Sequence, residues 1–504
     1  MFDIIPRGAN PIDKATSGES LFNHRMDGTG PWKKEFDAFS AFFEDGSLYI
    51  ADEMRSSNEA AYVIDVAKEL QNNVQIYFTQ SARISELSTY LNGNKISSEG
   101  DIDKGEALAA LNQIIILAND SKASDIHMSI EGSVCTVKFR VFGVLRSSDP
   151  IPAAFAEAMM SSAFYACDQA DQGYKPLVPQ AGRIDVKYLG INVRYETIRC
   201  QWQTNAEGRE LVMRLLPPLS SFGQLEDLDY TEHELEQFKE MMELPSGVVI
   251  TSGPTGSGKT TIQSILAVRQ YYDLKGEQKF KGFSDPIEYK LPFNQVSVNV
   301  DNDPEARDRA YKVAFKAEVR MDVDKVQYGE LRDVESAMAL LTFAGSGHFA
   351  WGSMHTPTVE RVIPQIEDLG VESATLYNEE IIAAAFCQRL LPKLCSCAVH
   401  LGKSKEHSDT RKRAQELGLK VENMRARNPG GCSKCRNMGL VGVVPVVEIL
   451  FYTPELMQLY RNKDMAGVQQ YLIDNEVGSL MDSALVKIEQ GVVDPKMAEL
   501  SLGR

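Results

Sequence analysis

Hydrophobic and polar positions alternate along the chain in strand-like and helix-like patterns. Among the first hundred residues, two apolar runs flank a stretch with helical spacing. The runs are SLYIA at 47–51 and VQIYF at 74–78, and the helical stretch is AAYVIDVAKELQ at 60–71. This pattern predicts a small α/β domain. We expect residues 1–100 to be an N-terminal domain that docks a partner and carries no chemistry.

A polar, glycine-containing linker at 92–103 separates this domain from a second pattern. A helix is predicted from Gly105 to Asn119, because apolar residues recur there at helical spacing. The motif ASDIH at 123–127 and the alternating run VCTVKFRVFGVLR follow. Three further strand-like pieces read GRIDVKYL, INVRYETI and ELVMRLL. We therefore expect a domain over 105–220, followed by a linker and by a third domain over 228–394.

The second domain is rich in arginine around its last strands. Such side chains usually face solvent, but in an oligomer they can also reach a phosphate group bound to a neighbouring subunit, as arginine fingers do. The candidates are Arg183, Arg194, Arg199, Arg209 and Arg214.

The third domain begins with VVITSGPTGSGKTTIQ at 248–263. A β-branched run breaks into the spacing G-x-x-x-x-G-K-[ST], and a helical pattern follows. Glycines let backbone N–H groups approach phosphate oxygens, and the helix N-terminus favours anions. Lys259 would bridge the β- and γ-phosphates, and Thr260 would hold Mg²⁺. The sequence therefore predicts an ATP and Mg²⁺ site, with Gly253, Pro254, Thr255, Gly256, Ser257, Gly258, Lys259, Thr260 and Thr261 as binding residues.

Acidic residues and histidines follow the P-loop in an order that indicates an active site. Asp285 and Glu288 come just after a predicted strand, and Glu330 ends another one in VQYGELRD. His348 and His355 lie in AGSGHFAWGSMHTPT. Each carboxylate alone could be a solvated loop charge, but their order behind a P-loop favours a catalytic cluster.

Four cysteines form two closely spaced pairs in the last third of the chain. Cys395 and Cys397 are one residue closer than the usual CxxC spacing, while Cys432 and Cys435 form a regular knuckle in GGCSKCRNMG. Thiolates at such spacing suit structural Zn²⁺, with free thiols as the alternative. His400 is a possible substitute for Cys397. We expect a metal-binding subdomain over 395–440 and a helical region over 441–504.

Composition narrows the possible partners and location. The 504 residues carry a net charge of −17, which argues against nucleic acid as the main partner. The sequence holds no apolar run long enough to span a bilayer, and its start does not resemble a signal peptide. Eight cysteines in such a chain fit reduced thiols and metal ligands. We expect a cytoplasmic protein with at most peripheral membrane attachment.

Taken together, the motifs resemble those of the secretion ATPases of type IV pilus assembly and type II secretion. The resemblance covers about Gly105 to the C-terminus. It implies an α/β chain with a PAS-like N2 domain, a RecA-like P-loop motor domain, a small zinc-binding insertion and a helical C-terminus. It also implies a homohexamer, peripheral to the inner membrane, that hydrolyses ATP to drive an inner-membrane platform protein which adds pilins. The paired cysteines and the extra N-terminal domain favour the assembly and secretion branch over the retraction branch.

The resemblance assigns roles to single residues. Lys259 and Thr260 match the Walker A motif, Glu330 the atypical Walker B acid, and His355 the His box. Arg194 and Arg214 match the arginine fingers, with Lys138 and Arg140 in an earlier strand. The implied catalytic set is Glu330, Glu288, Asp285, His355, Arg194 and Arg214.

One position departs from the family pattern. The family's Asp box usually reads E-D-P-I-E, and its first glutamate is the expected activator of water. In this chain that position is Ser284. Asp285, Glu288 or Glu330 could orient the water instead. The leading hypothesis is an ATPase motor, and the alternative is a nucleotide-switched scaffold with weak hydrolysis. A nucleic-acid translocase is the third hypothesis.

Overall fold

A computed structural model describes most of the chain from Ser40 onward. The described residues are 40–43, 47–51, 54, 57–70, 74–79, 104–167, 173–204, 208–284, 287–296, 309, 313–317, 320–378, 381–403, 411–412, 414–415 and 421–503. The expected linker at 92–103 and Asp285 lie outside these residues, so the structure says nothing about either.

The N-terminal domain has the predicted strand–helix–strand pattern. Its elements are β1 (Ser40–Phe42), β2 (Ser47–Ala51), α2 (Asn58–Leu70) and β3 (Gln75–Thr79). The strands form a sheet in the order β1-β2-β3, in which β2 and β3 are parallel. Apolar residues of α2 and the sheet share one buried cluster. The additional strand β1 was not anticipated from the sequence.

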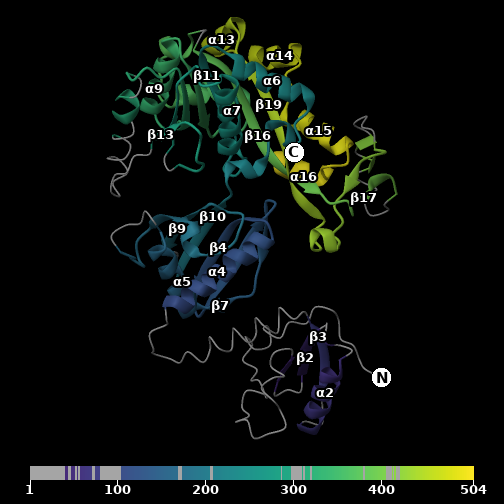
Figure 1. Ribbon diagram of the computed structural model, residues 1–504. Coiled ribbons are helices and arrows are strands. Elements are labelled where there is room, and N and C mark those ends of the chain that lie inside the picture. The colour runs from purple at the N-terminus through teal and green to yellow at the C-terminus, as the bar shows by residue number, and fades with distance from the viewer. Residues whose placement is uncertain are drawn as a thin grey trace.

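The middle domain is an antiparallel sheet covered by helices. Its elements are α4 (Lys104–Asp120), β4 (Ala123–Glu131), β5 (Val134–Val141), β6 (Val144–Ser147), β7 (Ile151–Pro152), α5 (Ala153–Tyr165), β8 (Gln180–Asp185), β9 (Thr197–Thr204) and β10 (Arg209–Leu216). The strand order is β6-β5-β4-β10-β9-β8, and β7 pairs with β5. Both helices lie on one face of this sheet (Figure 1). That the domain is PAS-like stays a prediction.

The prediction of a strand over INVRYETI is wrong for most of its length. The preceding strand β8 ends at Asp185, whose side chain accepts a hydrogen bond from the Lys187 N–H and starts a short 3₁₀ helix. Gly190 ends that turn with φ +66°. The chain then crosses to β9 as a loop, and only the last two residues of the predicted piece join that strand.

The P-loop domain is built on a seven-stranded sheet. Its strands are β11 (Gly247–Ser252), β12 (Phe280–Phe283), β13 (Asn294–Val296), β14 (Lys325–Glu330), β15 (Phe349–Met354), β16 (Ile382–Leu394) and β19 (Leu440–Phe451). Their order is β13-β12-β14-β15-β11-β16-β19. All neighbours are parallel except β16 and β19. Parallel strands place their carboxyl ends on one edge, where α/β proteins bind ligands.

Helices cover both faces of this sheet. They are α6 (Glu232–Glu243), α7 (Lys259–Asp273), α9 (Val334–Gly345), α10 (Val362–Asp368), α11 (Ser373–Leu376), α13 (Pro454–Arg461), α14 (Met465–Asp474), α15 (Leu480–Glu489) and α16 (Pro495–Leu502). Strand side chains alternate between the two faces: Val248 and Ile250 join the core with α9, whereas Val249 joins the core with α6 and α7. The β-branched run before the P-loop is thus a central strand, buried on both sides.

The expected helical region over 441–504 is partly wrong, because 441–451 belongs to strand β19. The whole strand, LVGVVPVVEILF at 440–451, is rich in β-branched residues and pairs antiparallel with β16. The remainder, from α13 to α16, is helical as predicted.

The segment between β16 and β19 contains the four clustered cysteines and a two-stranded ribbon, β17 (Val399–His400) with β18 (Arg425–Ala426). Met438, close to the second cysteine pair, packs against the core of the middle domain. The cysteine segment therefore touches both larger domains.

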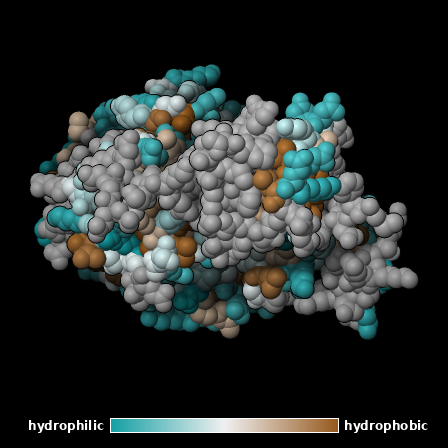
Figure 2. Space-filling model, turned by 90° about the horizontal axis from the view of Figure 1, so that it is seen from below, coloured by the Kyte–Doolittle hydropathy of each residue, from teal (hydrophilic) through white to brown (hydrophobic). Residues whose placement is uncertain are grey.

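None of the described helices is long and apolar enough to cross a membrane. Figure 2 views the molecule from below, and in the coloured part of this face brown apolar residues lie in patches between teal hydrophilic ones.

Candidate active site

The P-loop connects the carboxyl end of β11 to the N-terminus of α7. Gly258 precedes the helix with φ +83°, a conformation that favours glycine. At two of its glycines, Gly253 and Gly258, the loop lies so close to β16 that a side chain would not fit. A Cβ at Gly253 would be 2.6 Å from the Gln388 carbonyl oxygen, and one at Gly258 would be 2.8 Å from Gln388 Nε2. These two glycines of the motif are therefore needed for close backbone packing as well as for turn geometry.

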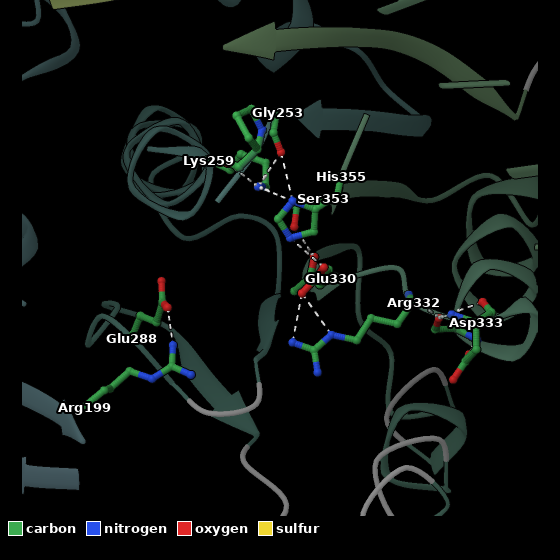
Figure 3. Close-up of polar contacts among 12 residues, drawn as sticks. Arg199, Gly253, Lys259, Glu288, Glu330, Arg332, Asp333, Ser353 and His355 are labelled. Carbon is green, nitrogen blue, oxygen red and sulfur yellow. Dashed lines mark hydrogen bonds and ion pairs between the residues drawn. The ribbon is translucent and has the colours of Figure 1, made fainter. Parts of the chain in front are cut away.

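Lys259 lies at the first turn of α7 and folds back over the loop (Figure 3). Its Nζ donates hydrogen bonds to the carbonyl oxygens of Gly253 (2.7 Å) and Pro254 (3.1 Å). Burial is the main reason that the pKa of this ammonium falls to about 8, although Glu330 opposes the shift. An incoming anion would relieve this burial cost, since it would supply the missing opposite charge.

A chain of polar contacts runs from Lys259 to Glu330 through His355. Lys259 Nζ lies 3.2 Å from His355 Nδ1, and His355 Nε2 lies 2.9 Å from Glu330 Oε1. With Nε2 protonated, the imidazole donates to Glu330 and accepts from Lys259. Glu330 Oε2 also accepts from Arg332 Nε at 2.9 Å. Three segments far apart in sequence thus meet at the carboxyl edge of the sheet (Figure 3).

Two neighbouring residues of these motifs have structural contacts instead. Asp333 caps α9, because its carboxylate accepts from the Ser336 N–H at 2.7 Å. His348 precedes β15, at the end of that strand opposite His355, and stacks on Phe343 with ring centroids 4.7 Å apart. His348 therefore lies at the far edge of the sheet from the P-loop.

The segment after β12 places Ser284 and Glu288 on the same side of the domain as the P-loop. A Cβ at Gly329, next to Glu330, would be 3.9 Å from Ser284 Oγ, so the serine borders the Walker B strand. Glu288 forms an ion pair with Arg199 of the middle domain at 2.5 Å (Figure 3). The sequence identified both partners as candidates but did not predict that they contact each other within one chain.

Two further contacts join this segment to the middle domain. Lys290 forms an ion pair with Glu196 at 2.5 Å, and Arg183 donates to the Ile287 carbonyl oxygen at 3.5 Å. The middle domain therefore touches the region that follows the Asp-box position.

The hydroxyl groups of the Walker motif differ in their surroundings. Thr260 is partly exposed in the first turn of α7. Thr261 Oγ1 lies 2.7 Å from the Tyr289 hydroxyl group. The Thr261 hydroxyl group therefore already has a partner in the protein. The Thr260 hydroxyl group is better placed to contact a ligand bound at the P-loop.

Arg194 and Arg214 lie in the middle domain with partners of their own. Arg214 Nε contacts Asp125 Oδ1 at 3.1 Å, and Asp125 also pairs with Arg140. Arg194 donates to the Ala123 carbonyl oxygen at 3.4 Å. Within the described part of this chain, no hydrogen bond or ion pair joins Arg194 or Arg214 to the P-loop. A finger role would require the P-loop of another subunit.

The four cysteines converge on one point. The sulfur atoms of Cys395 and Cys432 are 3.8 Å apart, those of Cys397 and Cys435 3.9 Å, and those of Cys432 and Cys435 3.8 Å. Zn–S bonds of about 2.3 Å in a tetrahedron give nearly this separation, about 3.8 Å. Cys397 belongs to the group, so the geometry does not require His400.

Backbone donors favour the thiolate form of Cys435, while burial and the neighbouring thiols raise the pKa of Cys397 to about 12. Burial raises the pKa of Cys435, but N–H groups of Cys432 and Gly439 donate to its sulfur and bring the pKa down to about 6. Stabilised thiolates are what a soft divalent metal binds. The residues thus fit a tetrahedral metal.

A P-loop at the carboxyl edge of a parallel sheet, with a lysine, a histidine and a carboxylate joined around it, defines an ATPase of the P-loop class. Residues 101–500 match the family model described as "Type II/IV secretion system protein". The chain belongs to this family and is an ATP-hydrolysing enzyme.

Relatives of known name support the same family. The chain is 27% identical over 391 residues to the "Type II secretion system ATPase E" of Vibrio cholerae, covering 77% of this chain and 74% of that protein. It is also 27% identical over 403 residues to the "Type IV pilus assembly ATPase PilB" of Thermus thermophilus, covering 79% of this chain but only 43% of that protein.

Solved structures agree on the fold. The X-ray structure of the Legionella pneumophila ATPase DotB aligns with TM-score 0.52 and 16% identity, covering 78% of this chain and 95% of that one. The pilus retraction motor PilT with bound ADP aligns with TM-score 0.50 and 20% identity, covering 77% of this chain and 96% of that one. At these identities the likeness concerns the fold alone.

Proposed function

We propose that the chain is the subunit of a homohexameric motor, located in the cytoplasm at the inner membrane, that uses ATP hydrolysis to drive assembly of a type IV pilus or a secretion pseudopilus. Its immediate partner would be an inner-membrane platform protein. The observation that carries the proposal is the contact chain Lys259–His355–Glu330 at the P-loop. The family, whose named relatives include both secretion and pilus assembly ATPases, supports it.

In this proposal two adjacent subunits each contribute residues to one active site. Lys259 holds the β- and γ-phosphates, Thr260 holds Mg²⁺, and Glu330 orients the attacking water with His355. Glu288 and Asp285 are the other candidate carboxylates. Arg194 and Arg214 would stabilise the phosphate charge of the adjacent subunit, because their own chain does not bring them to its P-loop.

A deletion and complementation experiment tests the proposal. Deleting the gene should abolish the filaments or the secretion of its host, and the intact chain should restore them while copurifying with a platform membrane protein as a hexamer. Normal filaments and secretion in the deletion strain would overturn the assembly function. DNA-stimulated hydrolysis would instead favour the nucleic-acid translocase, which the net charge of −17 disfavours.

Ser284 favours a second candidate, a nucleotide-switched scaffold with weak hydrolysis. The serine borders the strand of Glu330, so a longer acidic side chain at this position would reach the same region. For a scaffold, we expect Ser284→Glu to raise the steady-state turnover of ATP at least about tenfold, since a positioned base contributes at least that much. Ser284→Gln provides the control, because it has the same length without the charge. High turnover of the unmodified chain would exclude the scaffold.

The cysteine cluster is proposed to hold one structural Zn²⁺. Elemental analysis of the purified chain should find about one zinc per chain. Cys435→Ser should lose the metal and lower the melting temperature by several degrees, because the metal then no longer cross-links the segment between β16 and β19. Cys135→Ala, at a buried cysteine outside the cluster, is the control and should retain the metal. A full zinc content in Cys435→Ser would contradict this assignment.

A further inference from the structure

A buried glutamine connects the P-loop to the segment by which the chain enters its ATPase domain. Gln388 lies in β16 and is only 2% exposed. Its Nε2 donates to the carbonyl oxygen of Ser257, inside the P-loop, at 2.7 Å. Its Oε1 accepts from the hydroxyl group of Tyr230 at 2.5 Å. The side-chain amide of Gln388 therefore links the two segments, because its nitrogen bonds the P-loop and its oxygen bonds Tyr230.

The register of the sheet explains why this residue reaches the loop. Strand β16 is parallel to β11, and Ser252, the last residue of β11, pairs with Cys387. Gln388 thus lies one position beyond the end of β11, where the P-loop begins. Since a Cβ at Gly253 or Gly258 would touch Gln388, the loop backbone rests directly on this residue. A shift of the Gln388 side chain would therefore displace the loop.

Tyr230 belongs to the segment that joins the middle domain to α6. Its neighbour Asp229 forms an ion pair with Lys393 at 2.6 Å, and Lys487 donates to the Asp229 carbonyl oxygen. The Tyr230 ring packs edge-on against Phe238 of α6, with centroids 5.0 Å apart. The segment is thus docked on the same domain whose P-loop it contacts through Gln388.

We propose that Gln388 is a positioning residue, which makes the phosphate-binding geometry of the P-loop depend on the docking of residues 229–230. The inference rests on the proposed role of the loop in binding ATP. Gln388 would act on ATP through the Ser257 carbonyl, to which its Nε2 donates. Because residues 229–230 follow the middle domain, movement of that domain relative to its own ATPase domain would change the affinity of the loop for ATP.

A second buried glutamine in the same domain offers a matched control. Gln270, near the C-terminal end of α7, donates to the Met242 carbonyl oxygen at 2.6 Å and accepts from Trp351 Nε1 at 3.0 Å. It is 1% exposed, so its burial matches that of Gln388. It also bridges an aromatic donor and a backbone carbonyl, but its partners lie outside the P-loop.

The test compares Tyr230→Phe with Trp351→Phe, and Gln388→Met with Gln270→Met, in the full chain. ATP affinity is measured with a fluorescent ATP analogue, together with KM, kcat and melting temperature. We expect Tyr230→Phe and Gln388→Met to weaken ATP binding and raise KM about tenfold, the loss typical of one buried hydrogen bond. The control variants should lower the melting temperature at least as much, Trp351→Phe more so because it also shrinks a fully buried ring, while leaving KM within about twofold.

Equal KM values in Tyr230→Phe and Trp351→Phe would overturn the proposal, whatever the melting temperatures. If Gln388→Met does not fold, Tyr230→Phe decides alone, since it removes a single hydroxyl group. Failure of the ATP site itself would be recognised separately, because the wild-type chain would then not bind the ATP analogue. Failure of the assembly function alone would leave the KM differences between these variants in place.

Discussion

Replacing Lys259 with alanine is expected to lower kcat/KM for ATP by about 10²–10³-fold. This loss is typical when an enzyme loses one preorganised hydrogen-bond donor that stabilises the charge developing in the transition state. The ammonium is held over the P-loop by the carbonyl oxygens of Gly253 and Pro254. It therefore already lies at the loop that would take the phosphates, and alanine removes this charge. Steady-state ATP hydrolysis by the purified chain, with KM and kcat measured separately, checks this.

Lys325 provides a matched control for this substitution. It is also a buried lysine whose pKa burial lowers to about 8. Its Nζ donates to the Leu244 carbonyl oxygen at 3.3 Å and lies 4.3 Å from the Phe349 ring centre, at the strand end opposite the P-loop. Lys325→Ala should therefore cost stability but leave kcat/KM for ATP within a few-fold. Comparable losses of kcat/KM in the two variants would show that Lys259 acts only on folding.

The sequence predicted the P-loop well because its features are local. A strand, a glycine turn, a lysine and a helix follow one another in 16 residues, 248–263, and the backbone geometry of Gly258 confirms why glycine is needed there. The four cysteines could likewise be grouped from their spacing, and their sulfur atoms do converge. Strand β19 was missed, because only pairing with β16 shows that 441–451 completes the sheet.

Contacts between distant segments could not be predicted in the same way. Glu288 and Arg199 were both candidates, but their ion pair depends on how two domains pack against each other. Gln388 carries no motif that marks it as special, and its relation to Ser257 and Tyr230 comes only from the sheet register. The order of motifs indicated that Glu330 and His355 share a site, and the structure shows the contact that joins them.

Among the candidate carboxylates, Glu330 has the contacts expected of a catalytic residue. It is joined to Lys259 through His355, and its second oxygen accepts from Arg332. Glu288 forms its ion pair with Arg199 of the middle domain at 2.5 Å. Both carboxylates therefore pair with an arginine, but Glu330 is also linked through His355 to the lysine of the P-loop, where the phosphates would bind.

We therefore expect Glu330→Gln to reduce kcat for ATP by about 10²–10³-fold while ATP affinity changes less than about threefold, because glutamine keeps the size but loses the charge that orients water. Glu288→Gln should lower kcat less than about tenfold. Single-turnover hydrolysis and binding of a fluorescent ATP analogue separate chemistry from affinity in both variants. The reverse order, with Glu288→Gln nearly inactive and Glu330→Gln active, would assign water activation to the segment that follows Ser284. The Arg199–Glu288 contact would then have to open before each hydrolysis step.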